Sequence, residues 1–138
     1  MEFPSIADEW RKSRLTPSDG RLRVVLDTDT YNEVDDQFAV VHALLSPDRI
    51  SLEAMYAAPF HNNRSDGPGD GMEKSYEEII RLLERLGVSE RDRVYRGSSK
   101  YLPSRTEPVR SDAAEHLVEV SKSGEGPLYV AAIGAITN

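Results

Sequence analysis

The 138-residue sequence contains no cysteine, which excludes disulfide bonds and thiolate metal or redox sites. It lacks an apolar run of the ~18 residues that a membrane-spanning helix needs. Its first 20 residues have no apolar stretch typical of a signal peptide. Basic residues are also scarce, with 17 Lys and Arg against 24 Asp and Glu, and this balance argues against a nucleic-acid surface. We therefore expect a soluble cytoplasmic protein that binds neither nucleic acid nor a membrane.

Strand and helix signals alternate along most of the chain. Short apolar or β-branched runs predict strands at 21–27, 50–58, 92–97 and 127–138. Helical spacing of apolar residues begins near 35 and again at 72, and a third helix is predicted at 111–124, with Ser111 as a capping candidate. This order predicts an α/β fold with a parallel sheet and flanking helices, similar to a Rossmann fold. Residues 1–20 are interpreted as a lead-in segment to a domain at 21–138.

The unusual loops follow the predicted strands directly. The acid-rich stretch comes after the first strand, PFHNN after the second and GAITN after the fourth. Ligands of parallel α/β sheets bind at the carboxyl ends of the strands. We therefore expect one candidate site at that edge of the sheet.

Five carboxylates crowd into the segment RLRVVLDTDTYNEVDDQFAVVHALL, residues 21–45. They are Asp27, Asp29, Glu33, Asp35 and Asp36, and no Lys or Arg lies between Arg23 and Arg49. Carboxylates this close repel one another, so some must take up a proton or bind a cation.

Three interpretations of this cluster remain open. Acids at a helix start interact favourably with the helix dipole, which would account for Asp35 and Asp36 but not for Asp27 and Asp29. A hard-cation site would use carboxylates from both places, because an Asp at the strand end and an Asp in the first turn of the next helix can converge on one ion. A Mg²⁺-dependent phosphatase resembling the haloacid dehalogenases also begins with a strand and Asp-x-Asp; Asp27 would then be the nucleophile and Asp29 the acid.

The order of strand, DTD, loop, DD and apolar helix resembles the amino-terminal signature of the nucleoside hydrolases of the inosine–uridine-preferring type. The Asn-containing loop AAPFHNN and the turn GAITN are similar to two later features of that family, so the resemblance extends over about 21–138. It implies that this chain is the amino-terminal part of the fold, because the family has a further calcium-ligating Asp and a His in its carboxyl-terminal half.

The resemblance implies Ca²⁺-dependent hydrolysis of the N-glycosidic bond of ribonucleosides to ribose and free base. Asp29, Asp36 and the backbone carbonyl of Ile133 would bind the calcium ion. Asp29 would also act in catalysis by accepting a proton from the attacking water. Asp35 and Asn62 would bind the ribose, and Asp27 would support the cluster.

Two features depart from the family pattern. The loop between Asp29 and Asp35 has five residues, TYNEV, where three are common, so Tyr31 or Asn32 could reach the substrate. Ala135 stands where Pro is common. A non-catalytic domain that keeps the fold is a further alternative, and exposed sheet edges make a homo-oligomer plausible.

Overall fold

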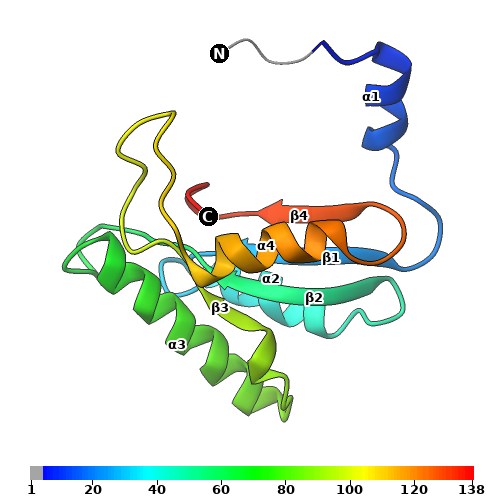
Figure 1. Ribbon diagram of the computed structural model, residues 1–138. Helices are drawn as coiled ribbons and strands as arrows, with labels where there is room; N and C mark the ends of the chain where they lie inside the picture. Colours follow the sequence, from blue (N-terminus) through cyan, green and yellow to red (C-terminus); the bar gives the residue numbers. More distant parts are fainter. Residues whose placement is uncertain (1–4) are drawn as a thin grey trace.

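The chain folds into an α/β domain with a four-stranded, all-parallel sheet flanked by helices, as the sequence predicted (Figure 1). The computed structural model describes residues 5–138, so the first four residues of the expected lead-in lie outside the described part. The elements, in chain order, are α1 Asp8–Leu15, β1 Leu22–Thr28, α2 Val34–Leu44, β2 Ile50–Ala57, α3 Pro68–Leu86, the 3₁₀ turn η1 Arg91–Arg93, β3 Val94–Arg96, α4 Asp112–Lys122 and β4 Leu128–Ala132.

The strand order in the sheet is β3-β2-β1-β4, with β1 between β2 and β4. The chain therefore first adds strands on one side of β1 and then crosses over to its other side. In open α/β sheets, the point where the strand order reverses leaves a crevice at the carboxyl ends of the two strands involved. In this fold that point lies between β1 and β4.

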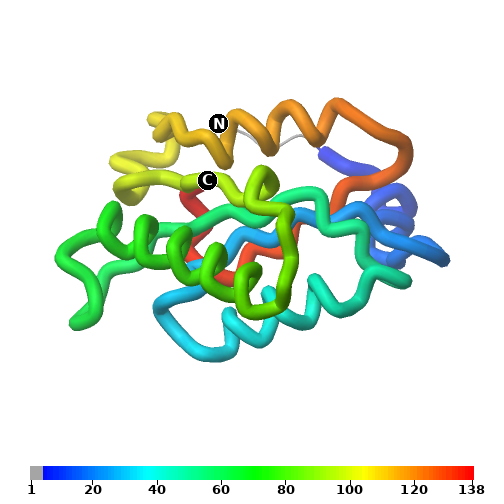
Figure 2. Tube along the Cα trace, turned by 90° about the horizontal axis from the view of Figure 1, so that it is seen from below, coloured from blue at the N-terminus to red at the C-terminus, as the bar shows by residue number. Residues whose placement is uncertain are grey.

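Two hydrophobic clusters cover the two faces of the sheet. On one face, side chains of α2 and α3 pack with Leu26, Leu52 and Met55. On the other, α4 packs with Val25 and Tyr56. Figure 2 shows α4 and α2 on opposite sides of the strands. Because both faces are covered, β1 and β2 are apolar along most of their length rather than alternating, as is typical of buried parallel strands.

Helix α3 begins at Pro68, four residues earlier than the sequence predicted. The Gly- and Pro-rich stretch before Met72 has the composition of a loop, but Pro is well suited to the first position of a helix. Gly71 is required by packing: an added Cβ would lie 2.0 Å from the carbonyl oxygen of Phe60. Helix α4 begins as predicted, with the Ser111 hydroxyl accepting a hydrogen bond from the amide of Ala114 at 3.1 Å.

The buried face of α2 does not coincide with its largest apolar side chains. Phe38 is 70% exposed and Leu45 is also exposed, whereas Asp36, Val40 and Ala43 are buried. The helix is rotated so that Asp36 points toward the end of β1.

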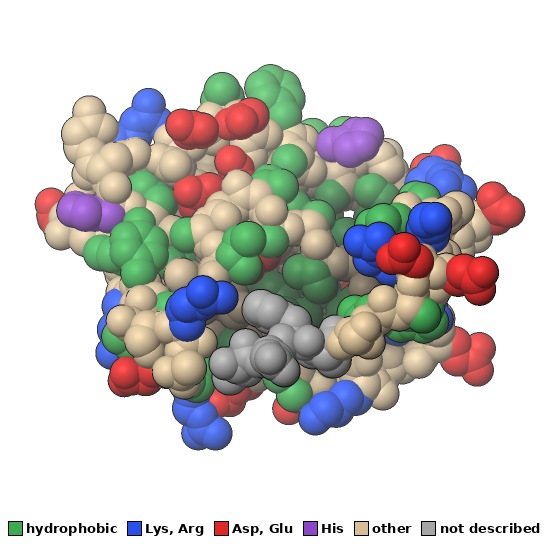
Figure 3. Space-filling view, turned by 90° about the horizontal axis from the view of Figure 1, so that it is seen from above, with side chains coloured by type: hydrophobic (Ala, Val, Ile, Leu, Met, Phe, Trp, Pro, Cys, Tyr) green, Lys and Arg blue, Asp and Glu red, His purple; other side chains and the backbone are tan. Residues whose placement is uncertain are grey.

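Strand β4 is an edge strand whose outer residues are open to solvent. Val130, Ile133 and Ile136 are exposed, and Figure 3, which looks down on the β4 side of the molecule, shows hydrophobic side chains among the polar ones there. Within residues 5–138, no helix is long and apolar enough to cross a membrane.

Candidate functional site

The carboxyl ends of the strands are tied together by backbone hydrogen bonds just beyond the regular ladder. The carbonyl of Asp27 accepts a bond from the amide of Ile133 at 2.8 Å, and the carbonyl of Thr28 accepts one from the amide of Ala58 at 2.8 Å. The end of β1 is thereby fixed to both neighbouring segments. As the sequence predicted, the DTD, PFHNN and GAITN segments meet at one edge of the sheet.

Asp27 is the innermost carboxylate, 4% exposed at the end of β1. Its Oδ1 accepts a hydrogen bond from Nδ2 of Asn138 at 3.1 Å, while Oδ1 of Asn138 accepts one from the amide of Ser98 at 2.6 Å. Because the backbone amide can only donate, this pair of contacts fixes which end of the Asn138 amide faces Asp27. Burial, opposed by this hydrogen bond, raises the pKa of Asp27 to about 6.

Asp29 lies just past the end of β1, beside the segment that follows β4, and is 8% exposed. A Cβ added to Gly134 would lie 2.9 Å from the amide nitrogen of Asp29 and 3.1 Å from its Oδ1. The backbone that follows Ile133 therefore approaches the Asp29 carboxylate closely, and any larger residue at 134 would press on it. Burial is the main cause that raises the pKa of Asp29, against a hydrogen bond from Asn32.

Asp36 and Asp35 occupy the first turn of α2 but face different surroundings. Asp36 is 6% exposed, and its Oδ1 accepts a hydrogen bond from the hydroxyl of Thr28, which also lies 3.0 Å from the hydroxyl of Thr30. Burial raises the pKa of Asp36, and the charge of Asp29 adds to this effect. Asp35 is exposed, which leaves its carboxylate open to a ligand from solution.

The donor set of this edge fits a hard cation. Within the described chain, no Lys or Arg forms an ion pair with Asp27, Asp29 or Asp36, although all three are buried. Buried charges without a partner are costly, and carboxylate and carbonyl oxygens are the ligands that Ca²⁺ prefers.

The protein supplies only part of a coordination shell for such an ion. No group of three or more His, Cys, Asp or Glu side chains suited to holding a metal ion occurs in residues 5–138. The predicted set has two carboxylates and one carbonyl, whereas Ca²⁺ takes six to eight oxygens. Water or substrate hydroxyls would have to provide the others.

The loop after β2 lies against the loop after β1. Nδ2 of Asn62 donates a hydrogen bond to Oδ1 of Asn32 at 2.6 Å, and the rings of Tyr31 and Phe60 stack with their centroids 6.4 Å apart. Asn62 is exposed, so it borders the acidic edge from the β2 side. Tyr31 and Asn32, which the sequence placed near a substrate, thus also contact the neighbouring loop.

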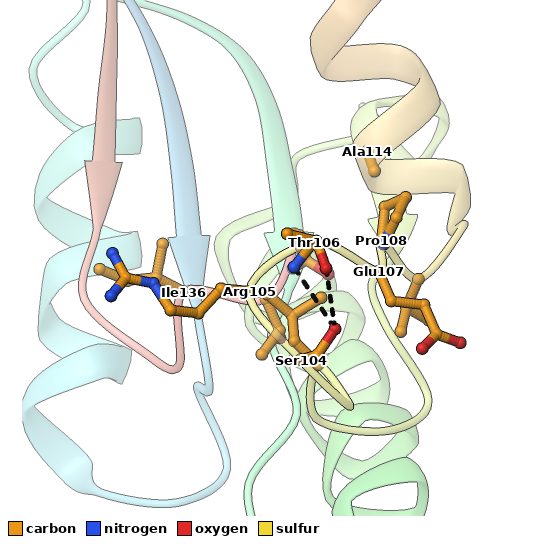
Figure 4. A pocket seen from close by; sticks show the side chains of 11 residues that line it. Ser104, Arg105, Thr106, Glu107, Pro108, Ala114 and Ile136 are labelled. Carbon is orange, nitrogen blue, oxygen red and sulfur yellow. Dashed lines mark hydrogen bonds between the residues drawn. The ribbon is translucent and has the colours of Figure 1, made fainter. Parts of the chain in front are cut away.

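A cavity of about 390 Å³ lies beside this edge, between the loop that joins β3 to α4 and the segment after β4 (Figure 4). Its walls are mostly apolar, with Leu102, Val109 and Ile136 among them, and Arg105 and Asn138 are among its polar lining residues. Asn138 belongs to both places, since it lines the cavity and donates to Asp27. The predicted carboxylates themselves do not line the cavity.

Sequence reasoning did not predict the role of three side chains that hold the carboxylates in place. They are Thr28, Asn32 and Asn138, each of which donates a hydrogen bond to one buried Asp. The repeated Thr in DTDT was a usable signal for the first, because Thr28 and Asp36 lie on one side of a strand-to-helix turn. The other two depend on which loops meet in space.

Comparison of the chain with protein-family models, with curated proteins and with solved structures gave no match. The fold and the site therefore define it as an α/β protein with an acidic edge at the switch point of its sheet.

Proposed function

We propose that this protein hydrolyses the N-glycosidic bond of ribonucleosides to ribose and free base in a Ca²⁺-dependent reaction. One observation carries the proposal: Asp27, Asp29 and Asp36 are buried together at the switch point with no ion-pair partner among the described residues. The order of these acids along the chain resembles the nucleoside hydrolases. The cytoplasmic location and a role in purine or pyrimidine salvage belong to the same proposal.

Asp29, Asp36 and the carbonyl of Ile133 would hold the calcium ion. The bound ion supplies orientation and a lowered pKa to an attacking water. Asp29 would accept the proton of that water, as a carboxylate within hydrogen-bond reach can do. Asp29 would thus bind both the cation and the attacking water.

The substrate residues would be Asp35 and Asn62, both of which are exposed. A carboxylate accepts hydrogen bonds from ribose hydroxyls, and an amide both donates and accepts. As the glycosidic bond breaks, the ribose develops an oxocarbenium-like positive charge, and carboxylates around it stabilise that charge. Asp27 supports the cluster from below through its bond with Asn138.

In the alternative phosphatase mechanism, Asp27 would be the nucleophile and would have to be accessible to the substrate. A nucleophilic carboxylate must reach the phosphorus atom, whereas Asp27 is 4% exposed and its Oδ1 already accepts a bond from Asn138. These contacts favour a supporting role for Asp27 and so favour the hydrolase.

The test is ribose release from inosine and from uridine, with added Ca²⁺ and with a chelator. We expect release that requires Ca²⁺ and that falls by about 10²-fold or more in Asp29→Asn, because general-base catalysis contributes at least that much. Asn63→Ala, an exposed neighbour of Asn62, is the control and should keep full activity. Mg²⁺-dependent phosphate release without ribose release would favour the phosphatase. Calcium binding without either reaction would favour a non-catalytic domain.

A further inference from the structure

Asn32 is bonded at every polar position it has. Its backbone amide donates to the carbonyl of Asp29 at 2.7 Å, and its backbone carbonyl accepts a hydrogen bond from the guanidinium of Arg64. Its side-chain Nδ2 donates to Oδ2 of Asp29 at 3.0 Å, and its Oδ1 accepts from Nδ2 of Asn62 at 2.6 Å. The first two bonds fix the loop, and the last two join the Asp29 carboxylate to the loop after β2.

The backbone amide of Arg64 determines which atom donates and which accepts in each of these side-chain hydrogen bonds. The backbone amide of Arg64 can only donate, and it contacts the Asn62 side chain at 2.9 Å, so the Asn62 atom there is Oδ1. The other end of the Asn62 amide is then Nδ2, which requires an acceptor, and Asn32 must present Oδ1 to it. The remaining end of Asn32 is Nδ2, and it faces a carboxylate that can only accept when ionised.

The two oxygens of Asp29 therefore have different surroundings. Oδ2 is held by Asn32, whereas Oδ1 lies on the side of Gly134, directly after Ile133. Ile133 contributes the carbonyl of the proposed cation site. The hydrogen bond from Asn32 holds the plane of the carboxylate, so that one oxygen is bonded to Asn32 while the other faces Gly134.

We propose that Asn32 is a positioning residue: its amide, oriented by Asn62 and Arg64, holds Oδ2 of Asp29 so that Oδ1 faces the end of β4, where the cation would bind. This inference rests on the proposed function for the identity of the cation. The hydrogen bonds from Asn62 through Asn32 to Asp29 do not depend on the proposed function. Asn62 thereby acts on the acidic edge through Asn32, in addition to facing solution.

The loop does not need the Asn32 side chain to keep its backbone shape, because Asn32 donates to Asp29 through its main-chain amide and accepts from the Arg64 guanidinium through its main-chain carbonyl. Asn32→Ala keeps both and removes only the two side-chain bonds. Partners that orient metal ligands typically change metal affinity by about 10- to 100-fold. This variant therefore separates positioning of Asp29 from folding of the loop.

The first experiment is calorimetric titration of the full chain with Ca²⁺ alone, for the wild type, Asn32→Ala, Asn62→Ala and the double variant. We expect Asn32→Ala to bind Ca²⁺ about 10- to 100-fold more weakly and Asn62→Ala to show a smaller loss. The double variant should be no weaker than Asn32→Ala, because Asn62 acts on Asp29 only through Asn32. Asn63→Ala is the matched control and should bind as the wild type does. Wild-type affinity in Asn32→Ala, or additive losses in the double variant, would overturn the proposal.

A second measurement needs no metal. The side-chain amide signals of Asn32, Asn62 and Asn63 are recorded by ¹H–¹⁵N NMR in the wild type and in Asp29→Ala, with a chelator present. The signals of Asn32 and Asn62 should differ between the two proteins, whereas the signal of Asn63 should not. If the wild type binds no Ca²⁺, the proposed Ca²⁺-dependent hydrolase activity is refuted. The NMR signals then test the positioning role of Asn32 by themselves. Signals of Asn32 and Asn62 that stay unmoved in Asp29→Ala would overturn it.

Discussion

Replacing Asp27 by Asn should stabilise the metal-free protein at neutral pH. Burial raises the pKa of this carboxyl to about 6, whereas in the unfolded chain it has its ordinary value, about 3.9. Between about pH 4 and pH 6, the folded protein therefore keeps a proton that the unfolded chain has lost. Stability falls as the pH rises through this window and levels off above it.

The size of the effect follows from the shift. About two pKa units at 1.36 kcal/mol each correspond to roughly 3 kcal/mol lost between about pH 4 and pH 7. Asn cannot ionise, and its side-chain oxygen can still accept the bond from Asn138. The variant should therefore match the wild type near pH 4 and exceed it by up to about 3 kcal/mol at pH 7.

Urea denaturation at several pH values, with a chelator present, measures this difference directly. Asp29 and Asp36 also have raised pKa values, so both proteins keep some pH dependence and only their difference reports on Asp27. Asp35→Asn is the control, since Asp35 is exposed and its neutralisation should change stability by no more than about 0.5 kcal/mol. An Asp27→Asn variant that is less stable than the wild type at pH 7 would refute the reasoning.

Three further substitutions test the packing that positions the site. Gly71→Ala should cost about 3 kcal/mol or more, because its Cβ would meet the carbonyl of Phe60 at 2.0 Å; urea midpoints equal to the wild type would contradict this close approach. Ser111→Ala should cost about 1 kcal/mol by removing the cap of α4, and thermal unfolding at an unchanged temperature would argue against the bond to Ala114. Leu83→Ala, in the cluster between α3 and the sheet, should cost about 2–5 kcal/mol in denaturant, and a loss under 1 kcal/mol would show that this core is loosely packed.

Much of the fold could be predicted from the sequence because local signals and packing agree. The β-branched run at Val24 and Val25 forms β1, and Ser111 caps α4 as its residue type indicates. The start of α3 could not be predicted from composition, because the glycines before Met72 suggested a loop. Gly71 is instead helical, and its lack of a side chain lets the Phe60 carbonyl lie close to the helix. Such a contact is visible only once both elements are placed.

The candidate site was predictable in location but not in its supporting bonds. Parallel strands bring their carboxyl ends to one edge, so the meeting of Asp29, Asn62 and Gly134 follows from topology. The chain from Asn62 through Asn32 to Asp29 depends on loop conformations that the sequence does not encode by spacing. The orientation of α2 is likewise not evident from hydrophobicity, since Phe38 is exposed and Asp36 is buried.

The most direct test of the central claim is calorimetric titration of the wild type with Ca²⁺, beside Asp36→Asn and Asp35→Asn. The account predicts saturable binding that is lost in Asp36→Asn, because a buried ligand is removed, and kept in Asp35→Asn, where only an exposed charge changes. No binding by the folded wild type, or equal binding by Asp36→Asn, would contradict the claim that the buried carboxylates hold a cation.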